Sequence, residues 1–346
     1  MEVFDSEPGF GHERVTLFND RDTGLKAVVA IHDTTLGPAA GGCRMWQYDT
    51  DEIALADAIR LSKAMTWKNA LAGLPLGGGK SVIIGDARVE QTPELLRAFG
   101  EAVQSLGGRY WTAEDVGTGL SAIRTISETC DYTFGVDRDP SPWTARGTLM
   151  AILAAVEHRF GDASLDGRQI AVQGVGNVGG SLVGMLTELG AHCTVTDVNE
   201  TALACMVDHH GSDVVGIDEI FDVPCDVFAP CALGGAINDE TVGRLKASIV
   251  AGSANNQLAE SGKHGPMLHE AGILYAPDYV ANSGGMLAVG GDVYGVRHTD
   301  DELTTLIDGI RPRVAAILER SEREERPPAD IAATMARETV RRARIC

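Results

Sequence analysis

Residues 174–179 read Gly-Val-Gly-Asn-Val-Gly, and this stretch decides how the second half of the chain is expected to fold. The apolar run at 170–172 directly before it predicts a buried strand, and a helical pattern follows to about residue 189. A second strand is predicted at 192–196, with Asp197 at its end. A strand, a GxGxxG turn, a helix and an acid about 20 residues further on form the pattern that dinucleotide binding requires. Glycines that merely turn the chain are the alternative, which suits an isolated motif better than this one.

Each residue of the motif has a mechanical part to play. Gly174 permits the tight turn, Gly176 lets the backbone approach a pyrophosphate, and Gly179 lets the helix pack closely on the strand. The free N–H groups at the helix start, at Asn177 and Val178, are expected to hold the anion.

Asp197 indicates which dinucleotide is preferred. Its carboxylate would accept hydrogen bonds from the adenosine ribose and repel a 2′-phosphate. Val198, Asn199 and Glu200 follow it, so no arginine stands ready for that phosphate. The sequence therefore favours NAD over NADP.

Strands and helices alternate around the motif from about residue 144 to residue 276, which predicts a parallel, doubly wound Rossmann sheet. Before it, the polar stretch at 137–142 contains two prolines and is typical of a hinge. We expect an α/β fold of two domains with a cleft between them. Residues 1–139 would form a substrate and oligomerisation domain, and residues 140–328 the NAD-binding domain. The helical tail at 329–346 is expected to pack back on the first domain.

The first region also has α/β patterning. Helices are expected at 51–72 and 92–106, the second with Thr92 as its cap and Pro93 at its first position. The predicted strands of this region lie at 14–18, 26–32, 81–84 and 109–112.

Composition excludes several function classes. The formal net charge of −20 repels nucleic acid, and no run of about 18 apolar residues or leader predicts a membrane span or export. We expect a cytoplasmic protein. The seven cysteines are scattered without a Cys-x-x-Cys pair, which favours reduced thiols and no metal site.

Lys80 is the first candidate for chemistry. The stretch 76–81, Leu-Gly-Gly-Gly-Lys-Ser, is similar to a P-loop, but Leu74 stands where a glycine is needed and the lysine precedes a strand. A lysine among glycines and apolar residues can instead be desolvated, which lowers its pKa from about 10.4 toward roughly 7 or 8 and makes it a usable base. Asp115 follows a short strand, a position where loop carboxylates often act.

A set of ordered motifs carries a resemblance to a known family. The motifs are GPAAGGCR at 37–44, KAMTWKNA at 63–70, LGGGK at 76–80, TAEDVG at 112–117, VQGVGNVG at 172–179, APCALG at 229–234, ANNQL at 254–258 and NSGG at 282–285. The same motifs occur in the same order in the glutamate, leucine, phenylalanine and valine dehydrogenases. The chain resembles this family over nearly its whole length, and it looks most similar to the leucine and phenylalanine enzymes.

The resemblance implies roles in the first domain. Lys68 looks like the lysine that binds the substrate carboxylate, helped by the backbone of Gly41 and Gly42. Lys80 resembles the catalytic base, and Asp115 resembles the acid that exchanges a proton with the amine. An ordinary surface lysine is the alternative reading of Lys68.

In the second domain, the resemblance places Asn282 at the substrate carboxylate. Thr144, Asn255 and the backbone of Ala232 would contact the nicotinamide and its ribose. The chain departs from the family in a shorter linker before Thr144 and in the charged Arg146, which bear on the geometry between the domains.

The implied reaction is the reversible, NAD-dependent oxidative deamination of an L-amino acid to a 2-oxo acid and ammonia. Ala40 stands where the glutamate enzymes have a lysine, so a side-chain carboxylate would be left unpaired, and a neutral substrate is expected. Met65, Ala113 and Leu287 are expected to line the rest of the pocket. A branched-chain substrate is favoured, and an aromatic one such as phenylalanine or tryptophan is the alternative.

Two other functions stay open. One is a catalytically silent NAD-binding sensor, and the other is a hydroxyacid dehydrogenase with a similar cofactor domain. The partners expected are a small amino acid or oxo acid, ammonia and further copies of the chain in a homo-oligomer.

Overall fold

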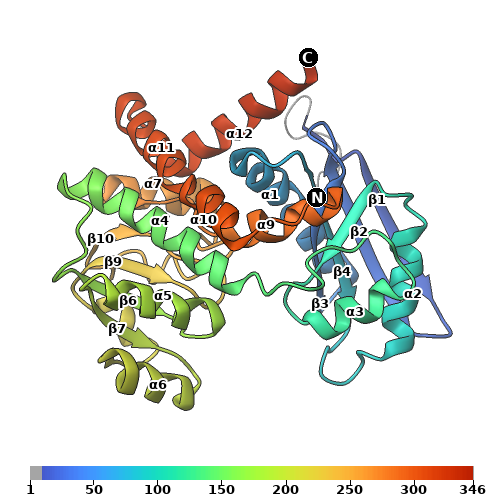
Figure 1. Ribbon diagram of the computed structural model, residues 1–346, viewed down its shortest axis with the longest axis horizontal. Helices are drawn as coiled ribbons and strands as arrows, with labels where there is room; N and C mark the ends of the chain where they lie inside the picture. Colours follow the sequence, from blue (N-terminus) through green and yellow to red (C-terminus); the bar gives the residue numbers. More distant parts are fainter. Residues whose placement is uncertain (1–9, 346) are drawn as a thin grey trace. The chain divides into compact units, whose positions relative to one another are not determined.

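The computed structural model describes residues 10–345, which divide into two compact units (Figure 1). The first unit contains residues 10–139, 289–297 and 336–345, and the second contains residues 140–288 and 298–335. Each unit is built on one β-sheet with helices packed against it. The predicted two-domain α/β fold class is confirmed.

A five-stranded mixed sheet forms the centre of the first unit, in the order β1-β2-β4-β3-β5. β2 is antiparallel to both of its neighbours, whereas β3 runs parallel to β4 and β5. The parallel register puts the carboxyl ends of β3, β4 and β5 along one edge. The strands are β1 (Arg14–Asp20), β2 (Leu25–Asp33), β3 (Ala39–Trp46), β4 (Gly77–Ile84) and β5 (Tyr110–Ala113).

Strand β4 begins four residues earlier than the strand predicted at 81–84, so Lys80 lies inside the strand and not before it. The glycines are there because neighbours leave no room for side chains. A Cβ on Gly78 would overlap the hydroxyl oxygen of Thr66, and one on Gly79 would lie 2.6 Å from the ring of Tyr110. Close approach thus overrides the low strand propensity of glycine.

Helix α1 (Asp51–Ala72) packs on β4 and ends at Gly73, whose φ of 72° closes the helix in the left-handed region. Helix α2 (Pro93–Gln104) begins as predicted, because the Thr92 side chain accepts a hydrogen bond from the backbone N–H of Leu95. The α2 face that includes Phe99 is buried in the core, and each such apolar side chain contributes about 1.5–3 kcal/mol. Helix α3 (Leu120–Ser127) lies beside α2.

The second unit has a six-stranded parallel sheet in the order β11-β10-β9-β6-β7-β8. Counted from β6, this is the order 3-2-1-4-5-6 of a Rossmann fold, with the topological switch point between β6 and β9. The strands are β6 (Gln169–Gln173), β7 (His192–Thr196), β8 (Asp213–Val214), β9 (Cys225–Pro230), β10 (Ala247–Val250) and β11 (Leu274–Tyr275).

Helices connect these strands and complete the second unit. Helix α4 packs against α5 and α11, and the tail helix α12 begins in the second unit and ends in the first. The helices are α4 (Ser141–Phe160), α5 (Asn177–Glu188), α6 (Glu200–His210), η1 (Glu219–Asp222), α7 (Ser261–Glu270), α8 (Asp278–Ala281), α9 (Gly284–Val289), η2 (Gly290–Tyr294), α10 (Asp300–Asp308), α11 (Ile310–Glu324) and α12 (Pro328–Ile345), of which η2 belongs to the first unit.

Candidate functional site

Strand β3 carries three of the predicted substrate contacts on a backbone that other groups approach closely. Ala40 is fully buried, and Gly41 and Gly42 follow it. A Cβ added to Gly41 would lie 3.2 Å from Cγ of Met65, and one added to Gly42 would lie 2.8 Å from Cβ of Asp115. The glycines therefore bring the β3 backbone against the side chains of two other predicted site residues.

Lys80 and Asp115 form a buried ion pair beside these glycines. The Lys80 Nζ lies 2.8 Å from Oδ2 of Asp115, and the two side chains are 7% and 12% exposed. Asp115 sits in a turn after β5 that is closed by a hydrogen bond from its backbone N–H to the carbonyl of Thr118. Burial raises the pKa of Asp115, but the charges of Lys80 and Arg44 more than offset this effect, so its pKa lies below the ordinary value. The carboxylate is ionised at neutral pH.

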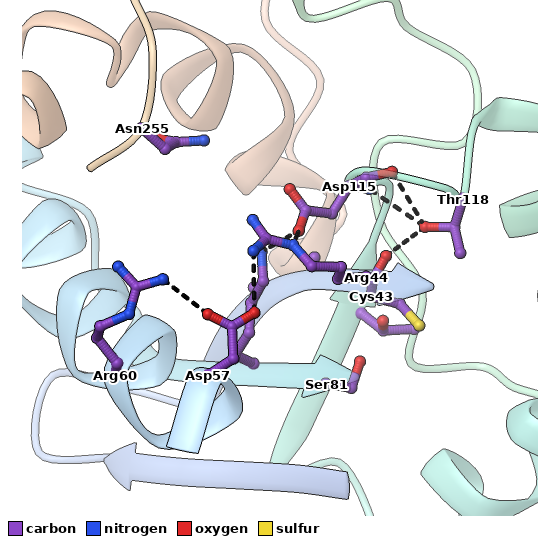
Figure 2. Close-up of polar contacts among 12 residues, drawn as sticks. Cys43, Arg44, Asp57, Arg60, Ser81, Asp115, Thr118 and Asn255 are labelled. Atoms are coloured by element: carbon purple, nitrogen blue, oxygen red, sulfur yellow. Dashed lines mark hydrogen bonds and ion pairs between the residues drawn. The ribbon is translucent and has the colours of Figure 1, made fainter. Parts of the chain in front are cut away.

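Arg44 is a further charged residue of this site, and it is not among the site residues predicted from the sequence. Its Nε lies 3.1 Å from Oδ2 of Asp115 and its Nη1 lies 2.9 Å from Oδ2 of Asp57 (Figure 2). The hydroxyl of Tyr48 also donates to Asp57, at 2.7 Å. The signal was present in the motif at 37–44, because an arginine that a strand buries needs carboxylate partners.

Lys68 lies on α1, one turn after Met65, so both project from the same face of the helix. Its side chain is largely buried, at 9% exposed, which an ordinary surface lysine is not. The next residue, Asn69, donates to the carbonyl of Gly77 at 2.6 Å and ties this part of α1 to the start of β4. Ala113, at the end of β5, is also buried. Roles in substrate binding stay predictions for all of these residues.

The motif glycines of the second unit have the surroundings that a dinucleotide loop needs. Gly174 has a φ of +92° and a Cβ there would lie 2.7 Å from the side chain of Ala232, while a Cβ on Gly179 would overlap the carbonyl of Gly174. A Cβ on Gly176 would meet no atom of the described chain within 4 Å. Two glycines are thus needed by the fold, and the third borders open space.

Helix α5 starts at Asn177 and Val178, with Gly176 as its N-cap. Within the described chain, no side chain caps this helix start. Backbone N–H groups at a helix N-terminus without a side-chain partner form an anion site, so the loop fits a pyrophosphate.

Asp197 is held in place at the end of β7. Its Oδ2 accepts a hydrogen bond from the backbone N–H of Val175 at 2.7 Å, and its Oδ1 accepts one from that of Asn199 at 2.9 Å. These bonds tie the carboxylate to the glycine loop, where it can meet the hydroxyls of a ribose.

A cavity of about 410 Å³ lies at the carboxyl ends of β6 and β7 and is lined in part by Asp197. Val198, Ile217 and Leu233 line it with exposed apolar surface, at 83%, 53% and 73% exposure. Thr196 also lines it, and its buried hydroxyl has no hydrogen-bond partner among residues 10–345. The exposed apolar wall of this cavity fits the flat ring of a nucleotide.

Two of the predicted ligand contacts lie together in the second unit. The amide of Asn282 donates to Oδ1 of Asn255 at 2.7 Å and to the carbonyl of Ser253 at 3.1 Å. Leu287, on α9, is buried in the same unit, whereas the other predicted substrate contacts belong to the first unit.

Helix α4 carries both Thr144 and the unexpected Arg146. The Thr144 hydroxyl donates to the carbonyl of Pro140 at 2.9 Å. The Nε and Nη2 of Arg146 each lie 2.8 Å from one carboxylate oxygen of Asp308 on α10. The extra charge is therefore neutralised by a bidentate ion pair within the second unit.

The described part of the chain contains neither a metal-binding cluster of side chains nor a helix that could span a membrane. No group of three or more His, Cys, Asp or Glu residues there could hold a metal ion, and no helix there is long and apolar enough to span a bilayer. Cys346 lies outside the described residues. The six described cysteines are free thiols: Cys43, Cys130, Cys193, Cys205, Cys225 and Cys231.

Comparisons with known sequences match most of the chain. The family model for the dimerisation domain of Glu/Leu/Phe/Val dehydrogenases matches residues 12–132, and the glutamate/leucine/phenylalanine/valine dehydrogenase model matches residues 199–345. The chain is 46% identical to leucine dehydrogenase of Bacillus subtilis, over 99% of this chain and 95% of that protein. It is 43% identical to valine dehydrogenase of Streptomyces albus, with the same two coverages of 99% and 95%.

A comparison with solved structures agrees. The structure of L-tryptophan dehydrogenase from Nostoc punctiforme matches with a TM-score of 0.83 and 40% sequence identity, covering 96% of this chain and 97% of that one. Both the sequence matches and the structural match extend over nearly the full length.

Proposed function

The chain belongs to the glutamate/leucine/phenylalanine/valine dehydrogenase family, and from this premise we propose that Lys80 and Asp115 perform the proton transfers of its reaction. The chain is an amino acid dehydrogenase, an oxidoreductase that acts on the CH–NH2 group and converts an L-amino acid to a 2-oxo acid and ammonia. The observation that carries the proposal is the 2.8 Å contact between Lys80 Nζ and Asp115 Oδ2 in a buried site lined by backbone glycines.

NAD, when bound at the glycine loop and Asp197, would accept the hydrogen that leaves the substrate carbon together with its two electrons. Lys68 binds the α-carboxylate through its ammonium group. Asp115 takes a proton from the substrate ammonium, so that the nitrogen lone pair can form the imine. Once Asp115 holds that proton, Lys80 has lost its anionic partner and releases its own proton to solvent, and the neutral amine then takes a proton from water as the water oxygen bonds to the imine carbon. Lys80 passes the proton from water to solvent, and Asp115 returns its proton to nitrogen. As the C–N bond breaks, Lys80 takes the hydroxyl proton of the carbinolamine, which releases ammonia and the 2-oxo acid.

Two features support NAD in preference to NADP. The fixed carboxylate of Asp197 would repel a 2′-phosphate, and Val198 follows it where a cation would be needed. The cytoplasmic location and the homo-oligomer expected from the sequence stay predictions.

The substrate side chain is neutral in this proposal, because Ala40 supplies no charge to a distal carboxylate. Branched-chain amino acids are favoured, and the resemblance to leucine and valine dehydrogenases supports this choice. An aromatic substrate is the second candidate. The small side chain of Ala40 and the resemblance to a tryptophan dehydrogenase favour it.

The test is an NADH oxidation assay over a panel of branched-chain and aromatic 2-oxo acids, with and without ammonium. We expect turnover that requires ammonium and is fastest with branched-chain acids. Turnover without ammonium would indicate a hydroxyacid dehydrogenase. NADH binding without turnover would indicate a sensor.

Variants then test the residue roles. Lys80→Ala and Asp115→Asn should each lower kcat by about 100-fold or more, since general acid–base groups typically contribute that much. Lys26→Ala is the matched control, because Lys26 is an exposed lysine on the adjacent strand β2. Full activity in Lys80→Ala would remove the basis of the mechanism.

A further inference from the structure

Arg44 reaches the proposed proton-transfer pair from the neighbouring strand. Its Nε contacts Oδ2 of Asp115 at 3.1 Å (Figure 2). Lys80 contacts the same oxygen at 2.8 Å. The Arg44 side chain is only 17% exposed. Two cations from adjacent strands therefore converge on one carboxylate oxygen.

The other end of the Arg44 guanidinium is anchored. Its Nη1 lies 2.9 Å from Oδ2 of Asp57 on α1, and Asp57 is held in turn by the Tyr48 hydroxyl at 2.7 Å and by Arg60 at 2.7 Å. A guanidinium group is planar and rigid, so an ion pair at one nitrogen also fixes the orientation of the other nitrogens. The contact with Asp57 therefore orients the Arg44 Nε toward Asp115. A lysine ammonium has no such planar group.

We propose that Arg44, anchored by Asp57, is a positioning residue that fixes Asp115 for proton exchange with the substrate nitrogen. This inference rests on the proposed function, in which Asp115 exchanges that proton. Arg44 acts through Asp115. It belongs to β3, which lies between β4, the strand that carries Lys80, and β5, the strand that Asp115 follows. Without Arg44, Lys80 alone would hold the Asp115 carboxylate by an ion pair, and the carboxylate could move with the lysine side chain. Ion pairs to two cations from different strands fix the position of the carboxylate.

The electrostatics of the site point the same way. Arg44 and Lys80 lower the pKa of Asp115 against the effect of its burial, so Arg44 helps to keep Asp115 able to accept a proton at neutral and mildly acidic pH. Removing Arg44 should therefore move the ionisation of Asp115 to higher pH. The titratable and charged groups that interact with Asp115 or with its partners are Cys43, Arg44, Tyr48, Asp57, Arg60, Lys80, Tyr110, Glu114 and Asp139.

The experiment compares pH profiles of kcat and kcat/KM for Arg44→Met, Arg44→Lys and Asp57→Asn. In Arg44→Met we expect kcat to fall about 10- to 100-fold, part of what an acid–base group contributes, with KM for the amino acid changed by less than about threefold. The acidic limb of the profile should move to higher pH. Arg44→Lys keeps the positive charge, so the acidic limb of the profile should return toward its wild-type pH. Only part of kcat should be restored, because a lysine lacks the guanidinium geometry that contacts both carboxylates.

Arg97→Met is the matched control. Arg97 forms an ion pair with Glu128 at 2.7 Å in the same unit, away from the site, so its loss should leave the profile unchanged. Urea denaturation of each variant reports whether it is folded. If Arg44→Met does not fold, Asp57→Asn decides, since loss of the anchor should lower kcat at nearly constant KM.

The outcomes separate this inference from the proposed function. A wild-type enzyme without ammonium-dependent turnover contradicts the proposed function itself. In an active enzyme, an acidic limb that stays in place in Arg44→Met overturns the positioning role alone. An unchanged kcat in Asp57→Asn would overturn it as well.

Discussion

Gly176→Ala separates ligand binding from folding within one motif. A Cβ at Gly176 meets no atom of the described chain within 4 Å, and the backbone φ of −67° is accessible to alanine. The gain of about 0.4–1 kcal/mol from a less flexible unfolded chain roughly offsets the poorer helix cap, so the free energy of unfolding should change by less than about 1 kcal/mol. In contrast, Gly174→Ala would be destabilised by strain alone by about 1–3 kcal/mol, since the φ there is +92°.

The same methyl group should strongly weaken NADH binding. It would occupy the space through which a pyrophosphate approaches the start of α5. A hydrogen bond to a charged group contributes about 1.5–3 kcal/mol, and each 1.4 kcal/mol changes an equilibrium constant about tenfold. Loss of one such bond at Gly176 therefore predicts a Kd for NADH that rises about 10- to 150-fold.

Fluorescence titration of NADH and urea denaturation measure the two effects on the same protein. Gly243→Ala is the matched control, because a Cβ there also meets no described atom within 4 Å and Gly243 lies outside the motif. A Kd within twofold of the wild-type value in Gly176→Ala would refute the assignment of the loop. A loss of stability as large as that of Gly174→Ala would refute the claim that Gly176 borders open space.

Three further variants test the first unit. The buried Tyr110 hydroxyl donates to the carbonyl of Gly41 at 2.8 Å and lies 2.9 Å from Oγ of Ser81. Tyr110→Phe removes these hydrogen bonds and should lower the free energy of unfolding, measured in urea, by about 1–3 kcal/mol. A change near zero would contradict this. Ala40→Leu should lower kcat/KM for aromatic relative to branched-chain substrates by about 10- to 200-fold, and an unchanged ratio would place residue 40 away from the side chain. Burial lowers the pKa of His32 to about 4, so between pH 6.5 and 4 the unfolded chain binds a proton that the folded chain does not. The free energy of unfolding should therefore decrease by about 3 kcal/mol as the pH is lowered through this range. Urea denaturation at several pH values should show a weaker pH dependence in His32→Gln, and an unchanged dependence would exclude His32 as its source.

Local rules were sufficient to predict the strands and helices around the glycine loop of the second unit. The apolar strand, the glycine turn and Asp197 each follow from short-range geometry, and the register of the parallel sheet then brings them together. The cap at Thr92 and the start of α2 at Pro93 were predictable for the same reason, since a helix start depends on a few adjacent residues.

Close packing between distant segments could not be predicted in this way. Three glycines look like a loop, and only the nearness of Thr66 and Tyr110 explains why β4 runs through them. Strand β3 was likewise not predicted, because Ala-Ala-Gly-Gly has little strand propensity. The interaction of Arg44 with Asp57 and Asp115 joins residues 13 and 71 positions apart, and no spacing rule connects them.

The first unit is assembled from segments that the ribosome makes at very different times. Residues 289–297 and 336–345 belong to it together with residues 10–139, and Arg344 forms an ion pair with Asp33. Residues 10–139 are therefore synthesised first and stay incompletely packed until nearly two hundred further residues have been translated. Truncating the tail would consequently damage the part of the protein that is most distant from it in the gene.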